Sequence, residues 1–120
     1  MKKISIFFVL TVFFACTSLL FGQSQIQSGK FNANSSSKGY ILDKNSGERT
    51  YTSEITFDKP FDKKPNVILS IAMIDADTKS NVRYNVEATS ISRDGFTLKI
   101  STWSDTKIFG ISGSWLAHID

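Results

Sequence analysis

The sequence has very little cysteine and histidine, and their scarcity excludes two kinds of site. Its 120 residues include one cysteine, Cys16, and one histidine, His118. Cys16 lies in an apolar N-terminal run, so the rest of the chain cannot supply a cysteine–histidine nucleophile. With one histidine and no cysteine left, a zinc site is not expected, and no cofactor is predicted. Proline is scarce too: Pro60 and Pro65 share one segment, which we interpret as a loop because proline cannot donate to a strand ladder.

The first 22 residues differ in composition from the rest of the chain. A basic head containing Lys2 and Lys3 precedes a nearly uncharged run, rich in Phe, Leu and Val, that ends at Phe21. This is the layout of a secretory signal peptide, predicted over residues 1–22 with cleavage after Gly22. The run lacks a basic stop-transfer flank, so we expect a secreted or extracellular protein with no membrane insertion after cleavage.

Cys16 leaves a second processing route open. A lipoprotein signal would make Cys16 the new N-terminus, with Ala15 as a suitable small residue before it, but Phe13 does not suit that motif and the apolar run continues to Phe21. Cleavage after Gly22 would instead leave 120 − 22 = 98 residues without cysteine. A domain of that size without disulfides depends on its core or on oligomerisation for stability.

The charge balance gives no reason to expect nucleic acid as a partner. The whole chain has 14 basic and 11 acidic side chains. Removing Lys2 and Lys3 with the leader leaves 14 − 2 = 12 basic groups, a net charge of +1 for residues 23–120. Neither nucleic acid nor an anionic membrane surface is expected to attract so balanced a domain.

After the leader, β-branched and aromatic residues come in six short runs separated by turn-forming residues, which is typical of strands. Phe96, Leu98 and Ile100 alternate with polar residues, as in a half-buried strand, whereas the run 67–73 is apolar on both faces except at Ser70, which predicts a central strand. No window shows a helical period. The predicted strands are Gln25–Phe31, Thr50–Phe57, Asn66–Ile74, Val82–Ser92, Phe96–Trp103 and Lys107–Ile119.

These runs predict an all-β fold, a single six-stranded antiparallel β-sandwich over residues 23–120. No internal repeat or second domain is visible. Asp94-Gly95 joins the fourth and fifth runs and predicts a tight hairpin, because this pair tolerates positive φ angles.

The acidic residues do not form a recognisable catalytic or metal site. Asp75 and Asp77 are spaced as a possible cation pair, but no third acidic ligand is near and aspartate is common in turns, so no metal is predicted. Glycoside hydrolysis needs two facing acids, one of them in an apolar setting. Glu54 and Glu87 lie in predicted strands at solvent-facing or cross-strand positions, so no catalytic residue is assigned and the protein is not predicted to be an enzyme.

Several polar and aromatic groups near strand ends suit a neutral sugar, which presents an apolar C–H face and directional hydroxyls. Trp103, Ser104 and Asp105 supply a ring, a hydroxyl and a carboxylate within one turn. Arg83 adds a planar fork of donors. Trp103 is three residues from Ile100 and therefore on the opposite face from the apolar set, which favours an exposed ring. Alternatively, Arg83 only pairs with a nearby surface aspartate at Asp75 or Asp77.

Seven short segments stand in order between Ile26 and Ile119. They are IQSGK at 26–30, ITF at 55–57, PNVILSI at 65–71, NVR at 81–83, GF at 95–96, TWSDTK at 102–107 and SW at 114–115. Together they resemble the H-type lectin domain of snail agglutinins and of the C-terminal part of discoidins. The resemblance implies a six-stranded sandwich that forms a trimer, or a dimer of trimers, and binds galactose or N-acetylgalactosamine between neighbouring subunits.

Within this resemblance, Arg83 matches the family's sugar-binding arginine and Trp103 the tryptophan that packs on the sugar. Ser104 stands where the snail lectin has a ligand-binding histidine, which weakens the expectation of a strict N-acetylgalactosamine preference. The family's aspartate from the loop before the second strand is matched by Ser46 or, with a small gap, by Asp43.

The resemblance also bears on stability. The snail lectin's internal disulfide is absent, its positions falling near Ala33 and Ile100, so more stability should come from the core and the trimer. Trp115 is expected in the core or at the trimer axis rather than at the ligand.

The predicted function is that of a secreted lectin that binds glycans without catalysis. Arg83 and an acid, Asp43 or Asp105, would hydrogen-bond sugar hydroxyls while Trp103 covers the C–H face. A structural or adhesion trimer that has kept the fold and lost the sugar is the alternative, favoured by Ser104 and by the unsettled position of the aspartate. A small hydrolase is a more distant rival, which would require cleavage that depends on one carboxylate.

Overall fold

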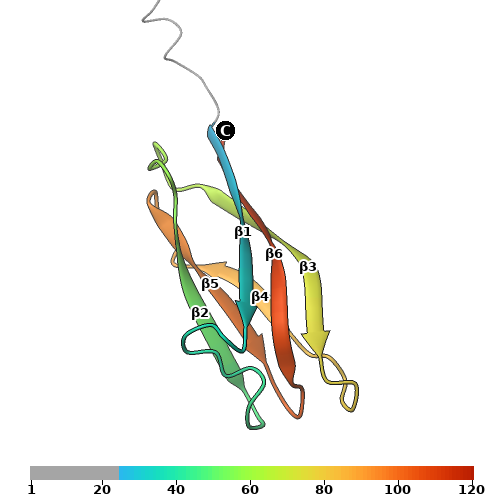
Figure 1. Cartoon of the computed structure of the whole chain (residues 1–120). Coiled ribbons are helices and arrows are strands. Elements are labelled where there is room, and N and C mark those ends of the chain that lie inside the picture. Colours follow the sequence, from blue (N-terminus) through green and yellow to red (C-terminus); the bar gives the residue numbers. More distant parts are fainter. Residues whose placement is uncertain (1–24) are drawn as a thin grey trace, which may run out of the picture.

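The computed structural model describes residues 25–120, which form six strands in two three-stranded sheets (Figure 1). The strands are β1 (Gln25–Asn34), β2 (Arg49–Thr56), β3 (Asn66–Ala76), β4 (Asn85–Thr89), β5 (Gly95–Thr102) and β6 (Ile108–Ile119). The predicted all-β, six-stranded antiparallel sandwich is confirmed. The predicted signal peptide, 1–22, and Cys16 lie outside the described residues.

Each sheet is antiparallel, and its central strand is the one that comes last of the three in the sequence. One sheet has the order β1-β6-β3 and the other β2-β5-β4. The alternation predicted for β5 is present: Phe96, Leu98 and Ile100 point into the sandwich and are at most 2% exposed. The polar residues between them face outward and pair across the sheet, as Lys99 does with Glu87 on β4.

The prediction that the 66–74 run forms a central strand is wrong. β3 is an edge strand, and β6 lies at the centre of its sheet. Val67 and Leu69 face the core, while Ile68 between them is 57% exposed. Apolar residues on both faces of a strand indicate that both faces are buried by other groups. They do not indicate that the strand hydrogen-bonds to a neighbour along each of its two edges. The outer apolar face of β3 is therefore open to another contact.

β4 ends at Thr89, before the predicted Ser92, and begins later than the predicted Val82 because the chain before it bonds to side chains instead of to a strand. The carbonyl of Arg83 accepts a hydrogen bond from the Thr102 hydroxyl (2.6 Å), and that of Asn81 accepts one from the Thr106 hydroxyl (2.5 Å). These bonds hold residues 81–84 beside the end of β5, and the ladder begins only at Asn85.

The predicted tight hairpin at Asp94-Gly95 is also wrong. Five residues, 90–94, connect β4 to β5, and the positive φ falls at Ser90 (50°). Gly95 is the first residue of β5, where a Cβ atom would lie 2.1 Å from the carbonyl oxygen of Ile55. A glycine at this position is required by the close approach of β2 rather than by turn geometry.

Aromatic rings fill the end of the core opposite the β5–β6 loop. Trp115 is 8% exposed and its ring centroid lies 5.6 Å from those of Phe57 and Phe96. Phe61 packs edge-on against Phe57 at 4.9 Å. Trp115 thus belongs to the core, as predicted. Gly29, its register partner on β1, makes room for the indole, which lies 2.7 Å from where a Cβ would stand.

Apolar packing occupies the positions near which the resemblance placed the snail lectin's disulfide. Ala33 on β1 is 2% exposed and Ile100 on β5 is fully buried. Both belong to the same cluster of buried residues. The described part of the chain is therefore stabilised at this level of the sandwich by burial rather than by a covalent link.

Candidate functional site

Three loops meet at one end of the sandwich, the lower end in Figure 1. They connect β1 to β2 (35–48), β3 to β4 (77–84) and β5 to β6 (103–107). Backbone hydrogen bonds join them: Gly47 N–H donates to Ser104 O at 2.9 Å, and Asp77 N–H donates to Lys107 O at 3.0 Å. Every predicted sugar-binding residue lies on one of these loops.

Arg83 and Asp105 form an ion pair between two of the loops. Arg83 Nη1 donates to Asp105 Oδ1 at 2.9 Å and to Thr106 Oγ1 at 3.2 Å. The arginine side chain is 28% exposed and the carboxylate 68%. The structure therefore brings together two predicted site residues and answers the alternative: Arg83 pairs with Asp105, and not with Asp75 or Asp77.

Trp103 and Ser104 follow directly after the last residue of β5. Trp103 is 43% exposed, in agreement with the predicted exposed ring. Ser104 has a φ of 60°, a left-handed conformation that is uncommon for a residue with a side chain. Its carbonyl accepts from Gly47 N–H, so the backbone of this turn is fixed while the Ser104 side chain remains exposed.

Asp43 and Ser46 lie on the β1–β2 loop and differ in surroundings. Ser46 is exposed and immediately precedes Gly47, which is bonded to Ser104. Asp43 is half-buried: its Oδ2 accepts from the Ser35 hydroxyl at 3.0 Å, while its Oδ1 is buried without a hydrogen-bond partner. Within residues 25–120 no hydrogen bond links Asp43 to the Arg83–Asp105 pair. Ser46 is thus held next to the β5–β6 loop by the Gly47–Ser104 hydrogen bond, whereas the Asp43 carboxylate bonds to Ser35 of its own loop.

Tyr40 shows how the β1–β2 loop is anchored. Its hydroxyl donates to the carbonyl of Ile108 at 2.6 Å, and the residue is 4% exposed. Burial raises the pKa of the Tyr40 hydroxyl, and the nearby charges of Asp43 and Asp75 raise it further. The phenol therefore stays protonated and keeps donating, which holds the loop against the first residue of β6.

Two buried polar residues at this end were not identified as site residues from the sequence. Arg49, at the start of β2, is 4% exposed, and Thr106, after Asp105, is fully buried. Both bond to the loops that carry the predicted site. The only available signal was a charged residue at a strand start and a threonine beside the Trp103 turn, neither of which distinguishes a buried anchor from a surface residue.

The other acidic candidates have ordinary structural partners. Asp77 Oδ1 caps its own turn by accepting from Lys79 N–H at 3.0 Å. Glu54 accepts from the Thr97 hydroxyl at 2.8 Å, and Glu87 lies 3.8 Å from Lys99, both on the outer face of the β2-β5-β4 sheet. Among residues 25–120, no three His, Cys, Asp or Glu side chains gather as a metal site, and no helix is long and apolar enough to cross a membrane.

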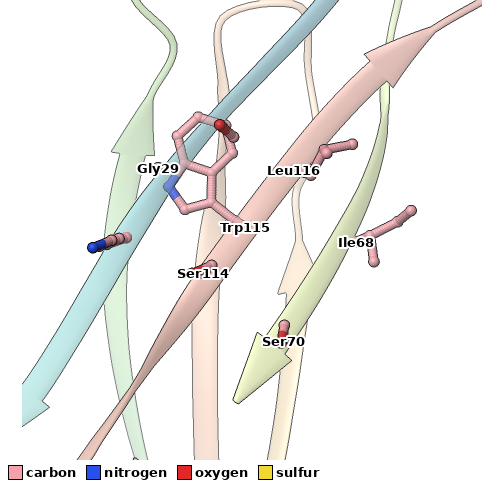
Figure 2. A pocket seen from close by; sticks show the side chains of 8 residues that line it. Gly29, Ile68, Ser70, Ser114, Trp115 and Leu116 are labelled. Carbon is pink, nitrogen blue, oxygen red and sulfur yellow. The ribbon is translucent and has the colours of Figure 1, made fainter. Parts of the chain in front are cut away.

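A hollow lies on the outer face of the β1-β6-β3 sheet, away from the three loops. Figure 2 shows the Trp115 indole lying across β1 at Gly29, with Leu116 beside it on β6 and Ile68 on β3. None of the predicted sugar-binding residues lines this hollow. Its walls belong to three strands of one sheet, which makes it part of a sheet face rather than a loop site.

Residues 52–118 match the family model of the H-type lectin domain. The chain belongs to this family. The matched segment contains Arg83, Trp103, Ser104 and Asp105, whereas Asp43 and Ser46 precede it. Membership supports carbohydrate binding without catalysis as the class of function for this H-type lectin.

One curated relative and two solved structures are similar to this H-type lectin. A protein of Fuscovulum blasticum described as "ATP synthase subunits region ORF 7" is 38% identical over 71 residues, which cover 59% of the lectin and 62% of that protein. The lectin thus spans less than two thirds of this relative's length.

Two structures of discoidin II from Dictyostelium discoideum, one recombinant and one wild-type, share the fold of the H-type lectin. They superpose with TM-scores of 0.71 and 0.72 at 22% and 21% identity, covering 82% of this chain and 38% and 37% of theirs. At this identity the likeness shows the fold, and the resemblance inferred from the seven sequence segments is confirmed.

Proposed function

We propose that this H-type lectin is exported and binds terminal galactose or N-acetylgalactosamine at the end of the sandwich that carries Arg83, Trp103 and Asp105. The observation that carries the proposal is the Arg83–Asp105 pair, 2.9 Å long, on the same side of the fold as a 43% exposed indole. A charged donor and a charged acceptor suit the hydroxyls of a monosaccharide, and an aromatic ring suits its C–H face.

Arg83 and Asp105 are proposed to hold sugar hydroxyls. The hydrogen bonds recorded for the Arg83 side chain within residues 25–120 all use Nη1, so Nε and Nη2 can donate to a ligand. Asp105 is 68% exposed and has oxygen lone pairs left to accept. Each charge-assisted bond contributes on the order of 1.5–3 kcal/mol.

Trp103 is proposed to cover the C–H face of the sugar, with Ser104 and Ser46 at its edge. Asp43 is the alternative carboxylate from the same loop as Ser46. Because Ser104 offers a short hydroxyl in place of the snail lectin's histidine, we expect galactose and N-acetylgalactosamine to bind with similar affinity. A site of this size binds in the millimolar range, about −4 kcal/mol.

We further propose that the outer face of the β1-β6-β3 sheet is the subunit interface of a homo-trimer, or of a dimer of trimers. Four exposed large apolar residues lie on it: Ile26 (65%), Ile68 (57%), Met73 (44%) and Leu116 (38%). Leu116 on β6 stands opposite Ile68 on β3. Large apolar side chains gathered on one exposed sheet face mark a site of contact with another protein. Trimeric presentation would raise avidity by about 10²–10⁴ on a clustered glycan surface.

Substitution of Ile68 by lysine tests the interface. Since Ile68 is 57% exposed in the single chain, we expect the variant to stay folded while the trimer dissociates to monomers, because a buried unpaired ammonium group would oppose association. Sedimentation velocity measures the mass. Thr56→Lys, on the outer face of the other sheet, is the matched control and should leave the trimer intact. A trimer that survives Ile68→Lys would contradict this interface.

The sugar specificity is tested on a glycan array with the full chain, recovered as the producing cells export it. We expect signal on terminal galactose and N-acetylgalactosamine glycans, and a loss of about tenfold in Trp103→Ala, corresponding to about 1–1.5 kcal/mol of ring stacking. Thr56→Lys again serves as the control. Silence across the array from folded protein would instead favour a structural or adhesion trimer without a sugar site.

A further inference from the structure

We propose that Arg49 is the positioning residue of the sugar site: its guanidinium ties together the loops that carry Trp103–Asp105 and Asp43–Ser46, and acts on Arg83 through Thr106. The proposal rests on the proposed function. Arg49 is not one of the predicted sugar-binding residues, and it contacts Ser104 only at the backbone carbonyl. It lies at the start of β2, opposite Thr102 in the register.

The guanidinium is buried and bonded only to backbone carbonyls. Arg49 is 4% exposed. A buried cation is costly unless its donors are satisfied, and here all three nitrogens have acceptors. Nε donates to Gly47 O (2.8 Å), Nη2 to Ser104 O (3.0 Å), and Nη1 to Thr106 O (2.8 Å), Lys44 O (3.0 Å) and Leu42 O (3.4 Å).

The acceptors belong to two loops that are far apart in the sequence. The carbonyls of Leu42, Lys44 and Gly47 lie on the β1–β2 loop, and those of Ser104 and Thr106 on the β5–β6 loop. A planar fork with donors pointing in several directions can join both sets at once, whereas the single ammonium group of a lysine cannot. Arginine is therefore specifically suited to this position.

Thr106 extends the network to the third loop. Its carbonyl accepts from Arg49, while its hydroxyl donates to Asn81 O at 2.5 Å and accepts from Arg83 Nη1 at 3.2 Å. Thr106 is fully buried. The chain of bonds from Arg49 to Thr106 to Arg83 thus fixes the arginine of the proposed site relative to the turn that carries Trp103.

The backbone conformation of Ser104 depends on the hydrogen bonds that Arg49 and Gly47 donate to it. Its left-handed backbone (φ 60°) is disfavoured for a serine, and its carbonyl is held by both Gly47 N–H and Arg49 Nη2. Residues in such conformations persist where their surroundings over-determine them. Loss of the Arg49 bonds would let this turn relax, and Trp103 and Asp105, on either side of Ser104, would move with it.

The other end of the sandwich offers a matched control. There Arg93 Nε donates to Phe61 O at 2.8 Å and so anchors the 57–65 loop. Arg93→Lys removes an arginine–carbonyl tie of the same kind, but at the end that has no predicted sugar contact. Arg49→Lys and Arg93→Lys therefore differ in which loops they release.

The test measures amide hydrogen exchange and galactose titration on full-chain protein well below its melting temperature. In Arg49→Lys we expect exchange at residues 42–47 and 103–107 to rise about tenfold, with the 57–65 loop unchanged, and galactose affinity to fall about tenfold. Arg93→Lys should show the reverse exchange pattern and full affinity. A uniform rise in exchange, or released loops with unchanged affinity, would overturn the proposal.

Thr106→Val covers the case in which Arg49→Lys does not fold. Valine keeps the shape of threonine but loses the hydroxyl, so we expect faster exchange at residues 79–84 and weaker galactose binding; unchanged exchange there would overturn the link to Arg83. If the unmodified chain binds no sugar, the proposed function fails, while the exchange pattern still decides whether Arg49 ties the loops together.

Discussion

Replacement of Arg83 by alanine is expected to weaken galactose binding by about tenfold to a hundredfold. The substitution removes the charged donors of the proposed site, and one charge-assisted hydrogen bond contributes about 1.5–3 kcal/mol. It also leaves Asp105 without its partner at 2.9 Å, so the carboxylate is no longer held in place for a hydroxyl. Isothermal titration with galactose and with N-acetylgalactosamine measures the loss.

The folded state should tolerate this substitution. The Arg83–Asp105 pair is 28% and 68% exposed, and an ion pair with so much solvent around it contributes only about 0–1 kcal/mol. Lys99→Ala is the matched control, because Lys99 also belongs to an exposed ion pair, with Glu87, but lies on the outer face of β5. Full affinity in Arg83→Ala, or equal losses in both variants, would remove Arg83 from the site.

Replacement of Trp115 by alanine is expected to lower the free energy of unfolding by about 3–5 kcal/mol. The indole is 8% exposed and packs against Phe57 and Phe96, so its removal opens a large cavity among rigid rings. A domain of this size has a total stability of about 5–15 kcal/mol. Chemical denaturation followed by circular dichroism should show a large shift of the midpoint or loss of the folded state.

The second tryptophan of the chain provides the opposite case. Trp103 is 43% exposed and follows the end of β5, so Trp103→Ala should change the unfolding midpoint little while it weakens sugar binding. The two variants separate the core role of one indole from the ligand role of the other. A Trp115→Ala protein with unchanged stability would contradict the packing of the Trp115 indole against Phe57 and Phe96 between the two sheets.

The proposed sugar site and the proposed subunit interface lie on different parts of the surface. The outer face of the β1-β6-β3 sheet carries Ile26, Ile68 and Leu116, while the outer face of the β2-β5-β4 sheet carries polar and charged pairs such as Glu87 with Lys99. A subunit contact through the first face would use none of the predicted sugar-binding residues, which lie on the three loops. The Ile68→Lys experiment therefore also shows whether binding depends on assembly.

The location of the strands was predictable because the alternation of apolar and polar residues within each segment indicates a strand. Phe96, Leu98 and Ile100 alternate with polar neighbours, and that period by itself places them on one face. The same local reasoning predicted that Trp103 would be exposed. The ordered segments from Ile26 to Ile119 were enough to indicate the H-type lectin family, which the match over residues 52–118 shows.

The order of strands could not be predicted in the same way. β6 is central although it contains Gly110 and Gly113, and β3 is an edge strand although it is apolar on both faces. Gly95 looked like part of a turn, yet it is required by the carbonyl of Ile55 on β2. These outcomes depend on which segments pair across the sheet, and a strand's own composition does not identify its partner.

The sequence by itself therefore determined the number of strands, their inward faces and the exposed loop residues at one end, because hydrophobic periodicity and turn chemistry act over a few neighbouring residues. Only the tertiary structure decided that Arg83 pairs with Asp105 and that Arg49 ties the loops together. Arg49 and Ser104 are 55 residues apart, and the acceptor is a backbone carbonyl, a group that every residue has. No side-chain pattern can mark such a contact before the chain is folded.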